Sequence, residues 1–251
     1  MIRGLDVFKE YFRDFQDQYV LIGGAACDII FSEAELPFRA TRDFDMVLIV
    51  EALTPGFGKR FWDFIMAGGY ENRARGNGSP QFYRFDKPKA VDFPYMIELF
   101  ARAESVFDDD FRGCRPLHLG EEISSLSAIL LNSDYYQLLL DGRAAMSDVT
   151  ILPDVYLILF KAKAWLDMSK RKAAGQRIDD SDIRKHKNDV ARLAVLLTGN
   201  ETCVIPTSIQ EDMEQFMAAF DEAPPDMKAL GIANVSANDV TGLLRRVYVV
   251  G

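Results

Sequence analysis

The pattern of apolar and polar positions divides the chain into a strand-rich first part and a mainly helical second part. In the first part, short apolar runs bounded by turn residues predict strands, and these runs are Tyr19–Ile22, Met46–Val50, Gln81–Phe85 and Tyr95–Phe100. From Pro153 onward, apolar residues recur at the spacing of amphipathic helices. The sequence therefore predicts an α/β (α+β) fold, with a small mixed-sheet core over residues 1–120 and a mainly helical part over 121–251.

Two acids stand at the start of one predicted strand. Asp43 and Asp45 are two residues apart, so their side chains point to the same side of a strand. Neighbouring carboxylates repel each other unless a cation lies between them, and Mg²⁺ is the cation that prefers oxygen ligands and leaves positions open for phosphate. The pair is typical of metal-dependent phosphoryl or nucleotidyl transfer. An Asp-x-Asp pair on an exposed strand is more often solvated charge.

Gly23 and Gly24 follow the strand Tyr19–Ile22 and precede the predicted helical turns Ala25–Phe31. Glycines at such a point allow the backbone to come close to another group. Backbone N–H groups and the helix dipole at the start of a helix favour an anion such as phosphate. The same pattern also fits a simple tight turn.

A third acid, Glu98, is the lone charge inside the apolar strand Tyr95–Phe100. An unpaired buried carboxylate is costly, so Glu98 needs a cation or a hydrogen-bonding partner. If its strand lies beside that of Asp43 and Asp45, the three acids can share one metal cluster. Asp92 is a competing candidate, but its place before Phe93-Pro94 fits a loop.

The order of these motifs resembles the nucleotidyltransferase superfamily that includes DNA polymerase β. Within it, the chain is most similar to the AbiEii-type group, which contains the abortive-infection toxins of type IV toxin–antitoxin systems and their uncharacterised relatives. Residues 158–166 resemble the lysine-bearing helix of that group, and residues 182–193 resemble its K-D or K-x-D helix. Gly24 stands where many superfamily members carry serine.

The resemblance implies transfer of a nucleoside monophosphate from an NTP to an acceptor hydroxyl on RNA, a protein or a small molecule such as an aminoglycoside. It implies a two-ion Mg²⁺ site, a cleft for the nucleotide between the two parts, and a possible antitoxin partner. The implied catalytic and metal-binding residues are Asp43, Asp45 and Glu98, and the implied nucleotide-binding residues are Gly23, Gly24, Lys161, Lys187 and Asp189. The alternative is a catalytically silent module that binds a nucleotide or a partner protein.

The helical part contains polar residues on otherwise apolar faces. Lys161 lies on or beside the apolar stripe of its helix, where it either extends its amine to water or reaches an anion. Asp189 could orient Lys187 or Lys161, and His186 is more simply a core histidine than a catalytic one. Ser236 and Asp239 have the spacing of a capping box, which predicts a last helix.

Composition restricts the remaining possibilities. The net charge of −9 argues against broad, nonspecific nucleic-acid binding, although Lys and Arg are concentrated between residues 170 and 187. Three widely spaced cysteines, Cys27, Cys114 and Cys203, form no metal motif or disulfide framework, which favours the reducing cytoplasm. No apolar run approaches the roughly 20 residues that a membrane-spanning helix needs.

Overall fold

The computed structural model describes residues 2–74, 80–101 and 129–251. Cys114 and the boundary predicted between residues 120 and 121 lie outside these ranges. The chain divides into two compact units, of which unit 1 comprises residues 1–123 and 143–153, and unit 2 comprises residues 124–142 and 154–251. Residues 143–153 therefore belong with the sheet, although they follow the predicted boundary in the sequence.

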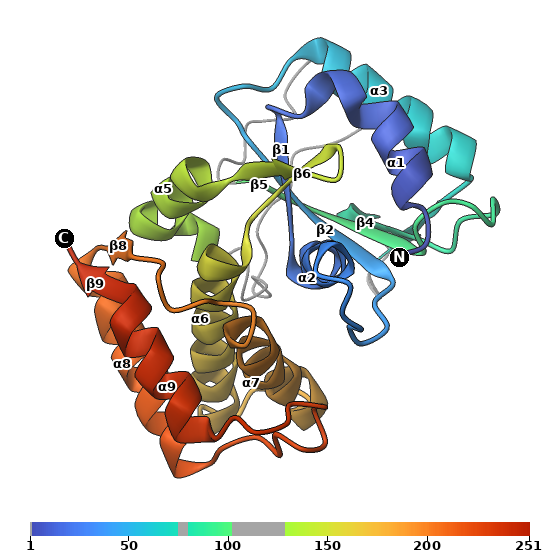
Figure 1. Cartoon of the computed structure of the whole chain (residues 1–251). Coiled ribbons are helices and arrows are strands. Elements are labelled where there is room, and N and C mark those ends of the chain that lie inside the picture. Colours follow the sequence, from blue (N-terminus) through green and yellow to red (C-terminus); the bar gives the residue numbers. More distant parts are fainter. Residues whose placement is uncertain (1, 75–79, 102–128) are drawn as a thin grey trace. The chain divides into compact units, whose positions relative to one another are not determined.

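Unit 1 is built on a mixed seven-stranded sheet in the order β3-β4-β5-β2-β1-β7-β6 (Figure 1). The β2–β5 and β1–β7 pairs are parallel and the other pairs are antiparallel. The elements of unit 1 are α1 (Leu5–Phe12), the 3₁₀-helix η1 (Arg13–Phe15), β1 (Tyr19–Ile22), α2 (Gly23–Glu33), β2 (Asp43–Leu48), α3 (Pro55–Gly68), β3 (Glu71–Ala74), β4 (Pro80–Asp86), β5 (Met96–Ala101), β6 (Ala144–Met146) and β7 (Val149–Ile151).

An aromatic core joins α1 and α3 to one face of this sheet. The ring centroid of Phe8 on α1 lies 5.4 Å from that of Tyr19 on β1 and 5.4 Å from that of Phe44 on β2. On α3, the ring centroid of Phe61 lies 5.5 Å from that of Phe85 on β4. Because side chains alternate along a strand, the residues that flank Phe44 project from the opposite face. Those residues are the two acids of β2.

Unit 2 is mainly helical, as the sequence predicts. Its elements are α5 (Ser133–Gly142), α6 (Asp154–Ala173), α7 (Asp180–Ala194), β8 (Cys203–Ile205), α8 (Thr207–Glu222), α9 (Ala237–Val247) and β9 (Tyr248–Val250). Helix α6 packs against α7 and α8, while β8 and β9 form a two-stranded parallel sheet. The predicted capping box of Ser236 and Asp239 is present at the start of α9.

The α/β fold class is confirmed, with small differences at element boundaries. Helix α2 begins at Gly23 itself rather than after the diglycine, and β2 begins at Asp43, so both acids lie within the strand. Helix α6 begins one residue after Pro153. Among the helices that the structure describes, none is both long and apolar enough to span a membrane.

Candidate functional site

The pairing of β2 with β5 places Asp45 directly beside Glu98. The two residues are register partners on parallel strands, and Asp43 is the partner of Met96 two residues earlier. Since register partners share a face and residues two apart do as well, Asp43, Asp45 and Glu98 project from one face of the sheet. The strand of Glu98 thus lies beside that of the two aspartates, as a site shared by the three acids requires.

Gly23 brings the start of α2 against Asp45. Its φ is +66°, and a Cβ at this position would lie 1.8 Å from Asp45 Oδ2. Asp45 is also the register partner of Ile22, the residue before Gly23. Because of this closeness to Gly23, the carboxylate of Asp45 lies near the positive end of the α2 helix dipole, and the first turn of α2 has no side-chain N-cap. This position favours negative charge from the protein or from a ligand.

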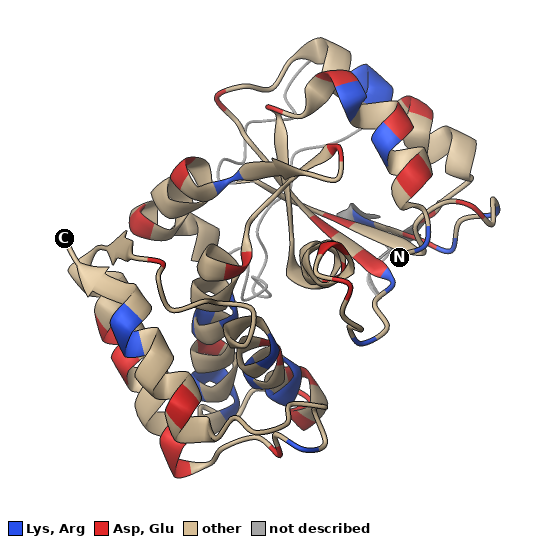
Figure 2. Cartoon of the chain, viewed as in Figure 1, with Lys and Arg blue, Asp and Glu red and all other residues tan. Residues whose placement is uncertain are grey.

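Gly24 is in close contact with the segment that precedes β2. A Cβ on Gly24 would lie 2.3 Å from Thr41 Oγ1, so a serine here would require the side chain of Thr41 to shift. Two arginines flank Thr41. The guanidinium of Arg39 lies 5.2 Å from the ring centroid of Phe38, and that of Arg42 lies 5.9 Å from the ring centroid of Tyr95. Positive charge therefore adjoins the acids at the start of β2 (Figure 2).

The partner that Glu98 requires is Arg84. Arg84 Nε donates a hydrogen bond of 2.5 Å to Glu98 Oε1, and the two residues are register partners on β4 and β5. The Glu98 side chain is 19% exposed, although its strand lies between β4 and β2 in the interior of the sheet. Within residues 2–74, 80–101 and 129–251, no three His, Cys, Asp or Glu side chains are grouped so as to hold a metal ion. The acids share a face, and the third one is bound by a guanidinium.

In unit 2, Lys161 and Asp189 form a buried ion pair. Lys161 Nζ lies 2.9 Å from Asp189 Oδ2, and the side chains are 6% and 0% exposed. Arg192 Nη1 lies 3.6 Å from the other carboxylate oxygen of Asp189. Of the two options for Lys161, the structure shows the amine bound to an anion rather than extended to water. The anion belongs to the protein itself.

Lys187 lies apart from this pair. Its Nζ donates a hydrogen bond of 2.5 Å to the backbone oxygen of Ala223 and lies 5.2 Å from the ring centroid of Trp165. Burial lowers the pKa of Lys187 from its usual value. Asp189 therefore pairs with Lys161 and not with Lys187. The predicted site residues fall into three places: the acids and glycines in unit 1, the Lys161–Asp189 pair in unit 2, and Lys187 in unit 2.

Sequence reasoning missed Arg84. The signal was available in part, because strand alternation places Arg84 on the face opposite its buried neighbour Phe85. Its pairing with Glu98 depends on the register between β4 and β5, which periodicity does not fix. Comparisons of the chain with family models, with curated proteins and with solved structures found no match.

Proposed function

We propose that this chain is a metal-dependent nucleotidyltransferase that moves a nucleoside monophosphate from an NTP to an acceptor hydroxyl. The observation that supports this most directly is the placement of Asp45 beside Glu98, with Asp43 on the same face and the start of α2 against Asp45. Three carboxylates on one face are a donor set that suits Mg²⁺. The absence of a side chain at Gly23 lets a helix N-terminus, which favours phosphate, adjoin that donor set.

Each residue has a role in this proposal. Asp43, Asp45 and Glu98 would hold Mg²⁺, and a two-ion site supplies activation of the acceptor hydroxyl and stabilisation of the attacking and leaving oxygens. The backbone at Gly23 and Gly24 would bind phosphate oxygens of the NTP. In the transfer, the acceptor oxygen forms a bond to the α-phosphorus, the bond to pyrophosphate breaks, and the hydroxyl proton is released.

The acceptor and the biological role follow from the motif resemblance. An AbiEii-type enzyme would act in the cytoplasm on RNA, a protein or a small molecule, with an antitoxin protein as its partner. The chain is acidic overall, which disfavours broad contact with a nucleic-acid backbone. An RNA acceptor would therefore be held at a local basic surface, and Lys and Arg are concentrated on α6 and α7 (Figure 2).

The test is to incubate the purified chain with each α-labelled NTP, Mg²⁺ and total RNA, and to measure label on RNA and on protein. Asp43→Ala and Asp45→Ala should each reduce labelling by a factor of ~100 or more. Asp63→Ala is the matched control, because Asp63 is an exposed aspartate on α3 of the same unit. Circular dichroism should show that all three variants are folded. Labelling by Asp45→Ala at the wild-type rate would refute the proposal.

The contact between Arg84 and Glu98 favours a second candidate function, a module that binds a nucleotide or partner without catalysis. In this case the guanidinium permanently takes the place that a metal ion would have at the third acid. Calorimetry together with the labelling assay separates the two functions. A catalytic site binds NTP more tightly with Mg²⁺ than without it and transfers label to an acceptor. A silent module binds ligand without producing label under any of these conditions.

A further inference from the structure

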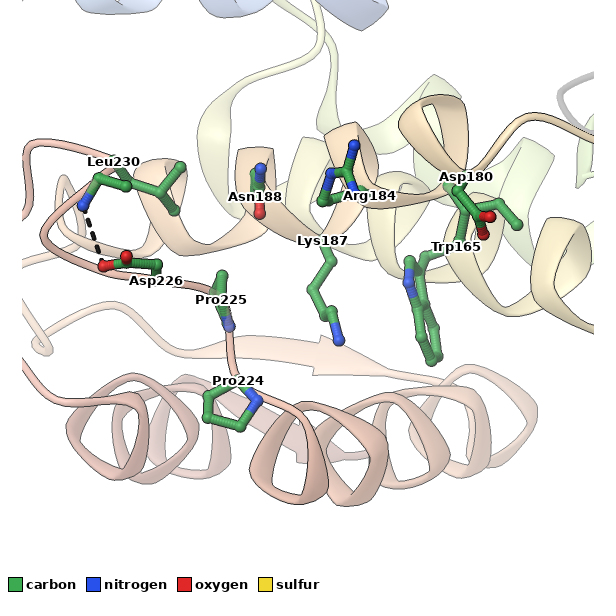
Figure 3. A pocket seen from close by; sticks show the side chains of 11 residues that line it. Trp165, Asp180, Arg184, Lys187, Asn188, Pro224, Pro225, Asp226 and Leu230 are labelled. Carbon is green, nitrogen blue, oxygen red and sulfur yellow. Dashed lines mark hydrogen bonds between the residues drawn. The ribbon is translucent and has the colours of Figure 1, made fainter.

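Unit 2 contains a pocket of about 530 Å³ that is distinct from the carboxylate face of unit 1. One wall is formed by α7, and the other by residues 224–230 of the segment that follows α8, while Trp165 of α6 lines one end (Figure 3). A volume of this size lies within the usual range for sites that bind small organic ligands, roughly 300–1,000 Å³. The pocket could therefore hold a molecule as large as a mononucleotide.

The walls of the pocket combine flat apolar surfaces with polar groups on one helix. Trp165, Pro224 and Pro225 present ring faces or edges, while Lys187 and Asn188 stand three and four residues after Arg184 on α7. Residues three and four apart on a helix are neighbours on its surface. Figure 3 shows Lys187 extending from α7 into the space between Trp165 and the two prolines.

The acids that line the pocket have partners within the protein, whereas neither of its two cations is in an ion pair with the residues that the structure describes. Asp180 pairs with Lys172 at 2.5 Å, and Asp226 Oδ1 accepts a hydrogen bond of 3.1 Å from the backbone N–H of Ala229. Arg184 forms no ion pair with any residue that the structure describes. Lys187 contacts a neutral carbonyl rather than a carboxylate. Arg184 and Lys187 are therefore the groups of the pocket to which an anion would bind.

We propose that this pocket binds a small molecule that carries a planar aromatic ring and an anionic group. The anionic group would contact Arg184 and Lys187. This contact would draw the amine of Lys187 away from the ring of Trp165, which it now overlies at 5.2 Å, and the ligand ring would lie against Trp165 and the prolines. A guanidinium binds carboxylate and phosphate through two parallel N–H donors, and a flat ring gains contact area from an aromatic surface. Nucleoside monophosphates and aromatic carboxylates share this chemistry. The site is independent of the nucleotidyltransferase proposal.

The first experiment uses the emission of Trp165. The chain has two tryptophans, so Trp62→Phe leaves Trp165 as the only one. This variant is titrated in EDTA with AMP, benzoate, adenosine and inorganic phosphate, and binding is measured by fluorescence and by calorimetry. AMP or benzoate should change the emission of Trp165, and which of them binds distinguishes the two ligand sources. Adenosine and phosphate each lack one half of the ligand and should bind at least about tenfold more weakly than AMP, if AMP is the ligand that binds.

Substitutions on α7 test the role of charge. Arg184→Ala should weaken binding of the effective probe by about tenfold or more, since it removes a charge-assisted hydrogen bond. Lys185→Ala removes a positive charge from the next position, but Lys185 is paired with Asp182 at 3.0 Å and does not line the pocket. It should therefore bind the probe like the parent variant. Both residues are exposed, so the fold should be retained.

Three results would overturn the proposal. The first is the absence of binding by AMP and benzoate up to roughly 10 mM, a concentration that would detect even very weak association. The second is equal affinity of Arg184→Ala and Lys185→Ala for the probe. The third is loss of binding in Asp45→Asn, which would assign the probe to unit 1. Because EDTA removes Mg²⁺ and no label is measured, failure here leaves the proposed transferase activity intact.

Discussion

The Cβ atom that Gly23 lacks would lie 1.8 Å from Oδ2 of Asp45. This relationship joins the first residue of α2 to the acidic strand β2, and it requires glycine for two independent reasons. The backbone of Gly23 has a φ of +66°, a left-handed conformation that glycine adopts readily. The space next to its Cα is occupied by a carboxylate. The helix start and the acid are therefore built as one structural feature.

Gly23→Ala should destabilise unit 1 and disturb Asp45. The left-handed backbone alone costs a non-glycine residue on the order of 1 kcal/mol, and strained positions of this kind cost up to ~3 kcal/mol. The new methyl group also displaces the carboxylate of Asp45. We expect the free energy of unfolding to fall by about 2 kcal/mol or more. Urea unfolding followed by circular dichroism measures this change.

Gly69→Ala provides the control for Gly23→Ala. Gly69 is in the same unit and has a φ of +62°, but its nearest neighbours are side-chain atoms of Lys89 at 3.2 Å or more, which can move. Gly69→Ala should therefore lower the free energy of unfolding less than Gly23→Ala does. Adding Asp45→Ala to Gly23→Ala should recover part of the lost stability. If the two glycine variants unfold at the same urea concentration, contact with Asp45 contributes nothing.

Local sequence patterns predicted much of unit 1, but they did not predict which residues would pair over long distances in the chain. The bounds of β1 follow from its apolar run and the glycines that end it, and the shared face of Asp43 and Asp45 follows from the alternation of side chains along a strand. The short strands β6 and β7 were missed because three residues each are too few to show a period, and β7 pairs with β1 across more than a hundred residues. Helix periodicity placed Lys161 on an apolar face, but it could not tell which acid would meet it.

Arg84→Ala should increase the affinity of the carboxylate face for divalent cations. The Arg84 guanidinium is bound to Glu98, so a metal ion at Glu98 must compete with it for the carboxylate. The arginine is 44% exposed, and partly exposed ion pairs are weak. We therefore expect Mg²⁺ or Mn²⁺ to bind about threefold to tenfold more tightly, as measured by calorimetry. Glu98→Gln should weaken the same binding.

Lys87→Ala is the control for Arg84→Ala. Lys87 is an exposed cation that pairs with Glu71 at 3.5 Å, so its removal changes the net charge equally without exposing Glu98. If both variants show the same metal affinity, the effect is one of overall charge. If Arg84→Ala binds metal no better than the unmodified chain, Glu98 is not a ligand, and the second candidate function is favoured.

Lys161→Ala should destabilise unit 2 strongly. The substitution leaves the buried carboxylate of Asp189 with Arg192, at 3.6 Å, in place of a direct partner at 2.9 Å. Removing one partner of a buried ion pair typically costs about 3–5 kcal/mol. We expect urea unfolding to show that the free energy of unfolding falls by an amount in this range. A lysine that served only to bind nucleotide would give the opposite pattern, with stability retained and NTP affinity lost.

Lys163→Ala is matched to Lys161→Ala, because Lys163 lies on the same helix and pairs with Asp212 at 2.7 Å. Its side chain is 29% exposed, so water can replace the lost partner and the loss should be about 1 kcal/mol. Lys161→Met combined with Asp189→Leu removes both buried charges and should recover most of the stability lost in Lys161→Ala. Equal losses for the two alanine variants would contradict a special role for burial.

Glu201→Gln should change how the stability of unit 2 depends on pH. The Glu201 carboxylate accepts hydrogen bonds from the backbone N–H groups of Thr198 and Gly199, at 3.0 and 2.8 Å, and from the Thr198 hydroxyl at 2.9 Å. The backbone N–H of Thr198 has the largest effect, and these bonds lower the pKa of Glu201 from 4.5 to about 2. The folded state therefore favours the charged carboxylate more than the unfolded state does.

The sign of the pH effect follows from this direction. A lowered pKa in the folded state adds stability above the unfolded pKa of 4.5, and that stability is lost as the pH falls from 4.5 towards 2. At neutral pH, Glu201→Gln should unfold at a lower urea concentration than the unmodified chain, and the two curves should converge as the pH falls through this window. Glu222→Gln, at an exposed acid of the same unit, should show no such convergence. A difference between Glu201→Gln and the unmodified chain that stays constant from pH 7 to pH 2 would mean that the hydrogen bonds at residues 198 and 199 do not depend on the charge of Glu201.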